Sequence, residues 1–323
     1  MGDGGWGTTL AVHLAKKKYK VNLWGAFPEY IAHLKKNREN TKFLPGIKIP
    51  LNVIFFSHLR KAIKDAELLV LAIPSQYAAP VIHRLKKFDL SQKIILSVIK
   101  GVETGTLLRV SEIIRKELKG IPLAVLSGPT IAMEVARGIP STAVIASPDG
   151  KIAKALQKIF NSETFRIYTN ADIVGVELGG SIKNVIALAC GVCDGLGFGT
   201  NTKAAILTRG LAEMTRLAIA MGAKSQTLFG LSGLGDLVTT AVNPKSRNRS
   251  VGEALGQGKS IRQITGKMAM VAEGVTTAKA IYALSKKYKV AMPITREVYN
   301  ILYKDKKPSA AVRDLMSREL KPE

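Results

Sequence analysis

The sequence is poor in residues that build disulfide, redox or metal sites. It contains two cysteines and four histidines in 323 residues. The cysteines, Cys190 and Cys193, form a single C-x-x-C, which offers too few ligands for a structural zinc site. Their apolar surroundings are also a poor setting for a reactive thiol, so we expect both side chains to pack as small hydrophobes and expect no metal.

Long apolar runs are also scarce. No stretch approaches the roughly 20 apolar residues that a membrane-spanning helix needs, and the start, MGDGGWG, lacks the charged-then-apolar layout of a signal peptide. We therefore expect a cytoplasmic protein with no membrane partner. At 46% hydrophobic composition the chain can form two domains with sizeable cores.

Acidic residues are few, with 24 Asp and Glu against 48 Lys and Arg and a formal net charge of +24. Such a balance makes nucleic-acid binding an alternative to weigh. The basic clusters, however, lie in separate segments without interleaved aromatic residues, at 16–18, 35–36, 286–287 and 306–307. This scatter favours a solvated surface that attracts small anions, and we expect no nucleic-acid partner.

The chain opens on a G-x-G-x-x-G motif formed by Gly2, Gly4 and Gly7, with Gly5 and Trp6 between the last two. The motif leads into TTLAVHLAKK, whose apolar spacing predicts a helix. Glycines at these positions allow a tight turn and a close backbone approach to a pyrophosphate at the helix N-terminus. The motif therefore predicts a dinucleotide site.

Two usual parts of such a site are missing. No strand precedes Gly2, although in a doubly wound sheet that strand is central. We expect upstream codons in frame to encode about five to seven mostly apolar residues ending before Gly2. After the strand expected at residues 19–24, Gly25, Ala26 and Phe27 offer neither an acid for the ribose of NAD nor an arginine for the 2′-phosphate of NADP. The sequence therefore does not indicate whether NAD or NADP is the cofactor.

Further short apolar runs alternate with helical stretches in the first half of the chain. This alternation predicts βαβ units and a Rossmann-like, doubly wound, mainly parallel sheet over residues 1–173. We expect its strands at residues 53–56, 68–73, 94–98, 123–126, 143–146 and 165–168. The segments 74–76, 100–101 and 127–130 follow strands, so each is either a ligand loop or a simple turn.

Residues 174–323 are rich in long helical patterns and predict an all-α second domain for substrate and catalysis. Residues 177–193 are almost wholly apolar or small, yet they carry Lys183. A helix without a polar stripe is buried on most sides, and burial lowers the pKa of a lysine and makes it usable as a base. Alternatively, the side chain reaches the surface. Since no histidine follows His83, Lys183 is the leading candidate for the base of a hydride-transfer enzyme.

Residues 230–250 are too rich in glycine for a helix core. They contain Ser246, Arg247, Asn248 and Arg249, a run that suits a phosphate clamp because guanidinium groups bind phosphate in a bidentate manner. The alternative is a solvent-exposed basic loop.

Several of these segments, in this order, resemble the bacterial-type NAD(P)-dependent glycerol-3-phosphate dehydrogenases over nearly the whole chain. They are GDGGWG, LWGAFPE, NTKFLPG, IPSQ, SVIKGVE, LSGPTIAMEVARGIPS, ELGGSIKNVIALACGV, NTKAAILTRGLAEM, GLGDL and KSRNRSVG. The resemblance implies hydride transfer between sn-glycerol 3-phosphate and dihydroxyacetone phosphate with NAD or NADP, which supplies glycerol 3-phosphate for phospholipid synthesis. Ala26 departs from the family, which often has Arg or His there.

The resemblance also implies residue roles. Lys183 takes the proton from the C2 hydroxyl, and Arg247 takes the phosphate. The expected substrate contacts are Lys100, Gly128, Thr130, Lys183, Asp236, Ser246, Arg247 and Asn248. The expected cofactor contacts are Gly2, Gly4, Gly5, Trp6, Gly7, Lys100, Ala132, Arg247 and Glu273. A homodimer is left open.

One alternative is a related reductase such as a ketopantoate reductase, which also pairs a Rossmann domain with a helical domain bearing a lysine. It needs a site for a carboxylate and not for a phosphate. The nucleic-acid alternative predicts salt-dependent duplex binding and gives no reason for a lysine in an apolar helix.

Overall fold

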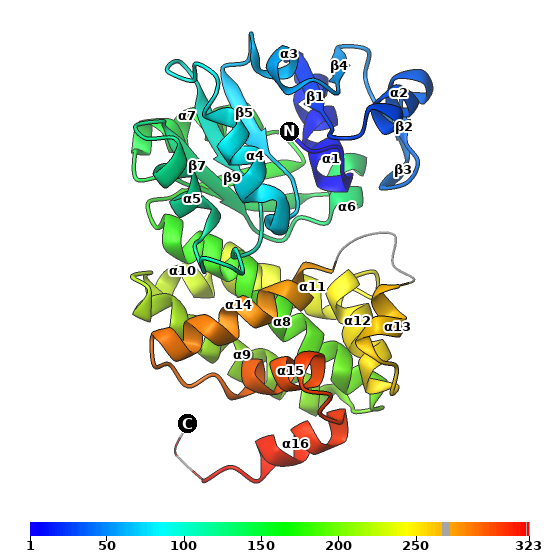
Figure 1. Cartoon of the computed structure of the whole chain (residues 1–323), viewed down its shortest axis with the longest axis vertical. Helices are drawn as coiled ribbons and strands as arrows, with labels where there is room; N and C mark the ends of the chain where they lie inside the picture. The colour runs from blue at the N-terminus through cyan, green and yellow to red at the C-terminus, as the bar shows by residue number, and fades with distance from the viewer. Residues whose placement is uncertain (267–271, 321, 323) are drawn as a thin grey trace. The chain divides into compact units, whose positions relative to one another are not determined.

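The computed structural model describes residues 1–266, 272–320 and 322. The chain divides into two compact units (Figure 1). Residues 1–99 and 109–173 form the first, here called the α/β unit, and residues 100–108 and 174–323 form the second, the helical unit. The short segment 100–108, expected within the first domain, therefore belongs to the helical unit.

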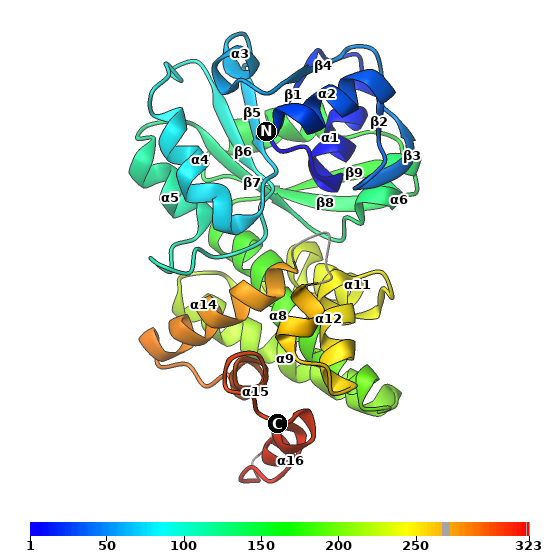
Figure 2. The ribbon, with the colours of Figure 1, turned by 45° about the vertical axis from the view of Figure 1, so that its right-hand side comes forward.

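A five-stranded sheet lies at the centre of the α/β unit (Figure 2). Its strands follow the order β5 (Leu68–Leu71), β6 (Ile94–Ser97), β7 (Leu123–Ser127), β8 (Ser141–Ala146) and β9 (Phe165–Asn170). All neighbouring strands run parallel except β7 and β8. The strands lie close to the ranges expected from the sequence, and the mainly parallel, Rossmann-like class is confirmed.

A second, two-stranded parallel sheet pairs β1 (Val21–Trp24) with β4 (Val53–Phe56). The first two residues of the chain hydrogen-bond toward both sheets. The ammonium nitrogen of Met1 donates to Val70 O at 2.8 Å, and the Gly2 amide donates to Trp24 O at 2.8 Å. The further strand expected before Gly2 stays a prediction. An antiparallel pair, β2 (Glu39–Asn40) and β3 (Leu44–Lys48), was not expected because its strands are short and contain Pro45 and Gly46.

Helices cover the strands of the α/β unit and bury one apolar face each. Their bounds are α1 (Gly5–Lys16), α2 (Pro28–Asn37), α3 (Leu59–Ile63), the 3₁₀ turn η1 (Ser75–Tyr77), α4 (Ala78–Leu85), α5 (Val110–Glu117), α6 (Ala132–Arg137) and α7 (Gly150–Phe160). In α7, the Asp149 carboxylate accepts hydrogen bonds from the Lys151 and Ile152 amides and caps the helix. Leu156 and Phe160 on its inner face join the core formed with β9.

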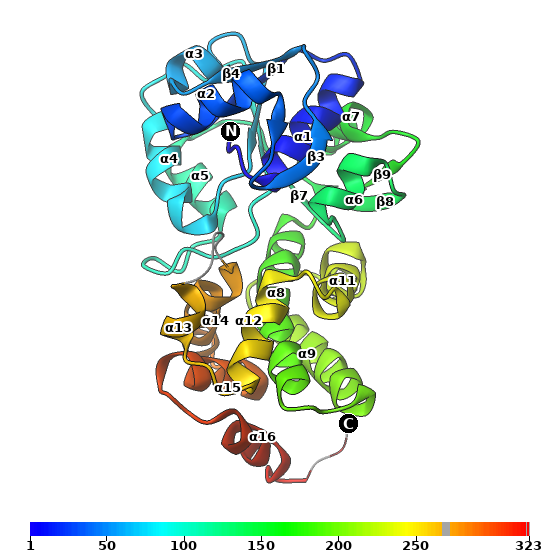
Figure 3. The same ribbon diagram turned by 90° about the vertical axis from the view of Figure 1, so that its right-hand side faces the viewer.

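The helical unit is built around α8 (Ile173–Gly195), and Figure 3 shows other helices of this unit around it. The helices of this unit that follow α8 are α9 (Thr200–Ala220), α10 (Ser225–Phe229), the π-helical turn η2 (Leu231–Gly235), α11 (Asp236–Val242), α12 (Arg247–Gly256), α13 (Ile261–Thr265), α14 (Glu273–Lys287), α15 (Pro293–Tyr303) and α16 (Pro308–Met316). Apolar residues on every side of α8, such as Ile182, Val185 and Ile186, are fully buried. The expectation of a buried helix is confirmed.

One expectation about apolar runs is wrong. Within the described part of the chain, α8 is by length and composition long and apolar enough to cross a membrane. Of its most apolar window, 94% is buried inside the protein, which is the environment of a core helix. Cys190 and Cys193 are part of this core, and burial raises the pKa of their thiols to about 12 and about 11. Both act as inert packing residues, as expected.

Glycines let α12 approach the backbone of α8. A Cβ atom on Gly191 would collide with the carbonyl oxygen of Arg249, and one on Gly252 would collide with the carbonyl oxygen of Leu188. The neighbouring Gly195 and Gly256 are as tightly enclosed. The obstructing atoms belong to the backbone, which cannot rotate away as a side chain can, so this helix pair depends on glycine.

We predict that Gly252→Ala lowers the free energy of unfolding of the helical unit by about 1–3 kcal/mol or more, the usual cost of overpacking a core. Urea-induced unfolding followed by circular dichroism measures this change. Gly199→Ser is the matched control, because a Cβ atom at Gly199 meets nothing within 4 Å and serine is a good N-cap for α9. Equal stability of the two variants would contradict the packing role.

Candidate active site

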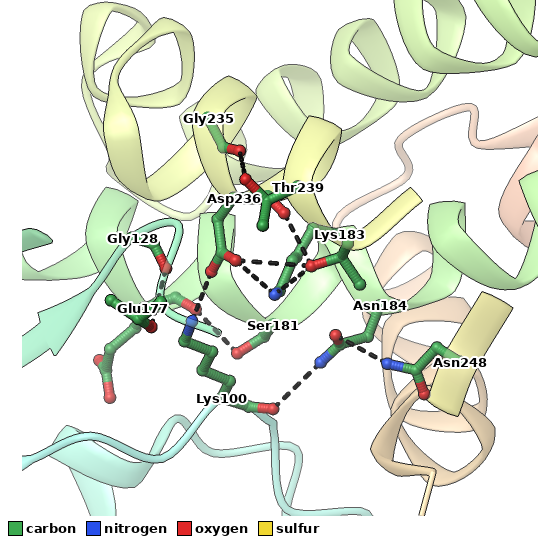
Figure 4. A network of polar contacts seen from close by, with 12 residues as sticks. Lys100, Gly128, Glu177, Ser181, Lys183, Asn184, Gly235, Asp236, Thr239 and Asn248 are labelled. Carbon is green, nitrogen blue, oxygen red and sulfur yellow. Dashed lines mark hydrogen bonds and ion pairs between the residues drawn. The ribbon is translucent and has the colours of Figure 1, made fainter. Parts of the chain in front are cut away.

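Lys183 lies in the middle of α8 and is 5% exposed. Its Nζ donates to Asp236 Oδ1 at 2.5 Å and to Thr240 Oγ1 at 2.6 Å. Figure 4 shows the ammonium directed at the Asp236 carboxylate. The alternative in which this side chain reaches the surface is therefore wrong.

The environment of Lys183 opposes its charge. Burial lowers the pKa of its amine to about 8, and the positive charge of Lys100 acts in the same direction. The carboxylates of Asp236 and Glu273 act in the opposite direction and favour the ammonium form. The result is an amine that both gives and takes a proton near neutral pH, which is what a general acid and base requires.

Asp236 joins two lysines from distant parts of the sequence. Its Oδ2 accepts from Lys100 Nζ at 2.7 Å while Oδ1 accepts from Lys183, and the residue is 1% exposed. Thr240, one turn later on α11, donates its hydroxyl to Asp236 O at 2.8 Å. Lys100 and Lys183 thus share one carboxylate, and the Glu273 carboxylate also acts on Lys183.

Two asparagines extend the cluster. Asn184 donates to Lys100 O at 3.4 Å and accepts from Asn248 Nδ2 at 2.9 Å (Figure 4). Asn248 Oδ1 in turn accepts from the Gly274 amide at 2.9 Å. This chain of bonds joins segment 100–108, α8, α12 and the start of α14. It also brings Glu273, the first residue of α14, into the electrostatic environment of Lys183.

The reading of residues 230–250 as non-helical is wrong for most of the segment. Glycines in η2 are used for close packing: a Cβ atom on Gly233 would collide with the carbonyl oxygen of Leu228, and one on Gly179 of α8 would lie 2.6 Å from Ser232 O. Helix α11 then begins at Asp236. Packing between backbones, and not chain flexibility, accounts for the glycine content.

The structure separates the roles of the residues in the expected phosphate clamp. The Ser246 hydroxyl caps α12 by accepting from the Arg249 amide, and Asn248 is buried in the asparagine chain described above. Arg249 Nε donates to Asp194 Oδ2 at 2.6 Å, so its guanidinium is held by α8. Arg247 is the first residue of α12, and its side chain is exposed.

The glycine motif forms the start of α1. Gly2 has φ +109°, and a Cβ atom on Gly7 would collide with Gly2 O, so the turn itself requires both glycines. Around Gly4, the N-cap, a Cβ atom meets nothing within 4 Å, and this residue has no side chain to cap the first amides of α1. Open space beside uncapped amides at a helix N-terminus suits a phosphate group.

Residues expected to touch the cofactor surround this turn in the α/β unit. Thr9 Oγ1 donates to Ala132 O at 3.0 Å, and the Ala132 methyl lies 3.9 Å from a Cβ built on Gly5. The Trp6 indole nitrogen is buried without a hydrogen-bond partner among the described residues. The structure therefore brings Ala132, although distant in sequence, to the glycine turn.

Gly128 and Thr130 follow the carboxyl end of β7 in the α/β unit. Gly128 has φ +141°, and a Cβ atom there would lie 3.0 Å from Ala143 Cα of β8. Thr130 Oγ1 donates to Gly128 O at 3.1 Å and fixes the turn. The carboxyl end of a strand is where ligands bind in such sheets.

Reasoning from the sequence missed Asn184 and Thr240. Asn184 directly follows Lys183 in the sequence. Thr240 lies four residues after Asp236, and in a helix this spacing places Asp236 and Thr240 on one face. That spacing was a usable signal, but it has meaning only if residues 236–242 are helical.

Comparisons with known proteins agree with this geometry. Family models described as NAD-dependent glycerol-3-phosphate dehydrogenase N-terminus and C-terminus match residues 1–153 and 172–313. The chain is 48% identical over 326 aligned residues to the glycerol-3-phosphate dehydrogenase (NAD(P)+) of Citrifermentans bemidjiense, with 100% of this chain and 97% of the relative covered. The crystal structure of the Coxiella burnetii glycerol-3-phosphate dehydrogenase superposes with TM-score 0.95 at 36% identity, covering 98% of this chain and 97% of that one.

A ketopantoate reductase from Ralstonia eutropha shares the fold at TM-score 0.60, with 15% identity, 97% of this chain covered and 98% of that one. This likeness is one of fold alone and does not favour the reductase alternative. Because the two family models and the 48% identical relative are glycerol-3-phosphate dehydrogenases, the chain belongs to the family of NAD-dependent glycerol-3-phosphate dehydrogenases.

Proposed function

We propose that this protein interconverts sn-glycerol 3-phosphate and dihydroxyacetone phosphate by hydride transfer with NAD or NADP. The observation that carries the proposal is the buried Lys183 amine, whose pKa is lowered to about 8 by burial and which is held by Asp236 and Thr240. A group of this kind can exchange a proton with the C2 oxygen of the substrate.

The α/β unit fits the cofactor. Gly4 leaves open space beside the first turn of α1 for the pyrophosphate, and Gly5 is proposed as a backbone contact there. Trp6 offers a buried indole N–H that no described residue accepts. Gly2, Gly7 and Ala132 are proposed as the other cofactor contacts of the α/β unit. Lys100, Arg247 and Glu273 are proposed as cofactor contacts from the helical unit. The bound nicotinamide supplies the hydride acceptor or donor at the substrate carbon.

In the reducing direction, Lys183 donates a proton to the C2 oxygen as negative charge develops there, and in the oxidising direction it removes that proton. Asp236 holds the amine in place through the 2.5 Å hydrogen bond. Lys100, on the other oxygen of the same carboxylate, adds positive charge that stabilises the developing oxyanion.

The phosphate of the substrate is proposed to bind at the start of α12. Arg247 is exposed there, and the amides of the first turn add a favourable helix dipole. Ser246 and Asn248 flank it, and Gly128 and Thr130 are proposed as contacts from the loop after β7.

The wider role is proposed on the same basis. We expect a cytoplasmic enzyme that supplies glycerol 3-phosphate for phospholipid synthesis, acts without a nucleic-acid or membrane partner, and can form a homodimer. The division into a cofactor domain at 1–173 and a substrate domain at 174–323 is also part of the proposal.

The deciding experiment is an assay at 340 nm with dihydroxyacetone phosphate and NADH or NADPH in turn. We expect loss of absorbance that depends on the phosphorylated substrate. Activity with ketopantoate, and none with dihydroxyacetone phosphate, would replace the proposal with the reductase alternative.

We predict that Lys183→Ala lowers kcat by about 10²–10⁴-fold while the Kd of NADH changes little, because the general acid is lost and the proposed cofactor contacts are untouched. Stopped-flow turnover and cofactor titration measure the two quantities. Lys279→Ala, which removes an exposed lysine from α14, is the control and should keep wild-type turnover. A near-normal kcat in Lys183→Ala would remove this residue from the mechanism.

The pKa of Lys183 predicts opposite pH profiles for the two directions. A lysine is protonated below its pKa, so reduction of dihydroxyacetone phosphate should be fastest below about pH 8 and fall above it, whereas oxidation of glycerol 3-phosphate should rise through the same pH. Measurement of kcat/KM in each direction between about pH 6.5 and 9.5 tests these two profiles. An inflection that persists unchanged in Lys183→Ala would assign it to another group.

We predict that Arg247→Ala weakens binding of the phosphorylated substrate by about 1.5–3 kcal/mol, the value of a charge-assisted hydrogen bond. The measurement compares kcat/KM for dihydroxyacetone phosphate and dihydroxyacetone, and preference for the phosphorylated form should collapse. Arg262→Ala, at an exposed arginine of α13, is the charge-matched control. If Arg247→Ala keeps the preference, the phosphate binds elsewhere.

A further inference from the structure

The end of β1 lacks the acid that binds the ribose of NAD in many dinucleotide sites, since Trp24 is followed by Gly25 and Ala26. The structure places another acid there. A Cβ atom built on Gly25 would overlap Oδ2 of Asp3, and the Cγ atom of Asp3 would lie 2.6 Å from it. The Asp3 carboxylate thus fills the space that a side chain at position 25 would occupy.

The backbone of Asp3 is held firmly in the glycine turn. Its carbonyl oxygen accepts from Asn40 Nδ2 at 2.8 Å and from Thr8 Oγ1 at 3.4 Å. Asn40 is fixed in turn, because its Oδ1 accepts from the Tyr30 hydroxyl at 2.5 Å. These bonds fix the backbone of Asp3 beside the end of β1.

The carboxylate oxygen of Asp3 that faces Gly25 lacks a hydrogen-bond donor among the described residues. Oδ2 is buried and has no hydrogen-bond partner within the part of the chain that the structure describes. Burial raises the pKa of Asp3, although Lys42 and the N-terminal ammonium offset this in part. A buried acceptor of this kind is costly unless a donor reaches it, and the hydroxyls of a ribose are such donors.

We propose that Asp3 supplies the ribose-binding acid that the end of β1 lacks, and that it makes the protein prefer NAD over NADP. The 2′-hydroxyl of NAD donates a hydrogen bond to the carboxylate. The 2′-phosphate of NADP is an anion without a donor at the pH of the cell and is repelled by the same group. This inference rests on the proposed use of a nicotinamide cofactor and names the residue that decides which one.

The test is the equilibrium binding of NADH and NADPH to the whole protein, measured by isothermal titration calorimetry without substrate. The wild type should bind NADH more tightly than NADPH. In Asp3→Asn, the ratio of the Kd of NADPH to that of NADH should fall by about tenfold or more, since a charged acceptor becomes neutral in nearly the same shape. Asp149→Asn is the control, because it removes one negative charge from the same unit, keeps a capping side chain on α7 and should leave the ratio unchanged.

A second variant guards against loss of folding at the glycine turn. Asp3→Ala combined with Gly25→Asp moves the acid to the residue that follows β1, and the first change vacates the space for it. The other close neighbour of a Cβ atom at position 25 is Ile31 Cδ1, the end of a side chain, at 2.8 Å. This double variant should regain NADH preference over Asp3→Ala alone, with melting temperatures measured in parallel. An unchanged ratio in Asp3→Asn, or no recovery in a folded double variant, would overturn the role of Asp3. Failure of the wild type to bind either cofactor would instead overturn the proposed function.

Discussion

The ion pair between Lys183 and Asp236 is the interaction on which the helical unit and its chemistry depend. Both side chains are almost completely buried, and an unpaired charge in such a place costs several kcal/mol. The pair therefore requires α8 and α11 to keep their positions. Burial lowers the pKa of the amine to about 8, although the Asp236 carboxylate favours the charged form. Stability and reactivity are linked in one contact, because the burial that demands a partner is also what lowers the pKa.

Close helix packing makes that contact possible. Glycines on α8 admit the backbones of α12 and η2, with Gly191 facing Arg249 and Gly179 facing Ser232. At this approach the short side chains of Asn184 and Asn248 reach each other and tie Lys100 to α14. A Cβ atom at either glycine would collide with the facing backbone, so a larger residue there would force these elements apart.

In the α/β unit, too, glycines make room for buried polar groups. Gly2, Gly7 and Gly25 clear space around the start of α1, and Asp3 occupies part of the space at the end of β1. The Oδ2 atom of Asp3 and the Trp6 indole nitrogen are buried without a hydrogen-bond partner among the described residues, which is unusual for buried polar atoms in folded proteins. Both atoms lie at the turn where the motif predicts a dinucleotide, so a ligand is the natural source of the missing hydrogen bonds.

The sequence by itself determined most strands of the α/β unit and the burial of α8, and it singled out Lys183 as a lysine in an apolar helix. These features depend on local apolar patterning, which residues 19–24, 53–56 and 177–193 carry. The expectation that residues 230–250 are not helical was wrong, because a high glycine content is found both in flexible loops and in tightly packed helices. Only the tertiary structure decided that Asp236 bridges two lysines, that Arg249 is held by Asp194 while Arg247 is exposed, and that the Asp3 carboxylate fills the space beside Gly25. Each of these is a contact between residues far apart in the chain, and no local pattern encodes such a distance.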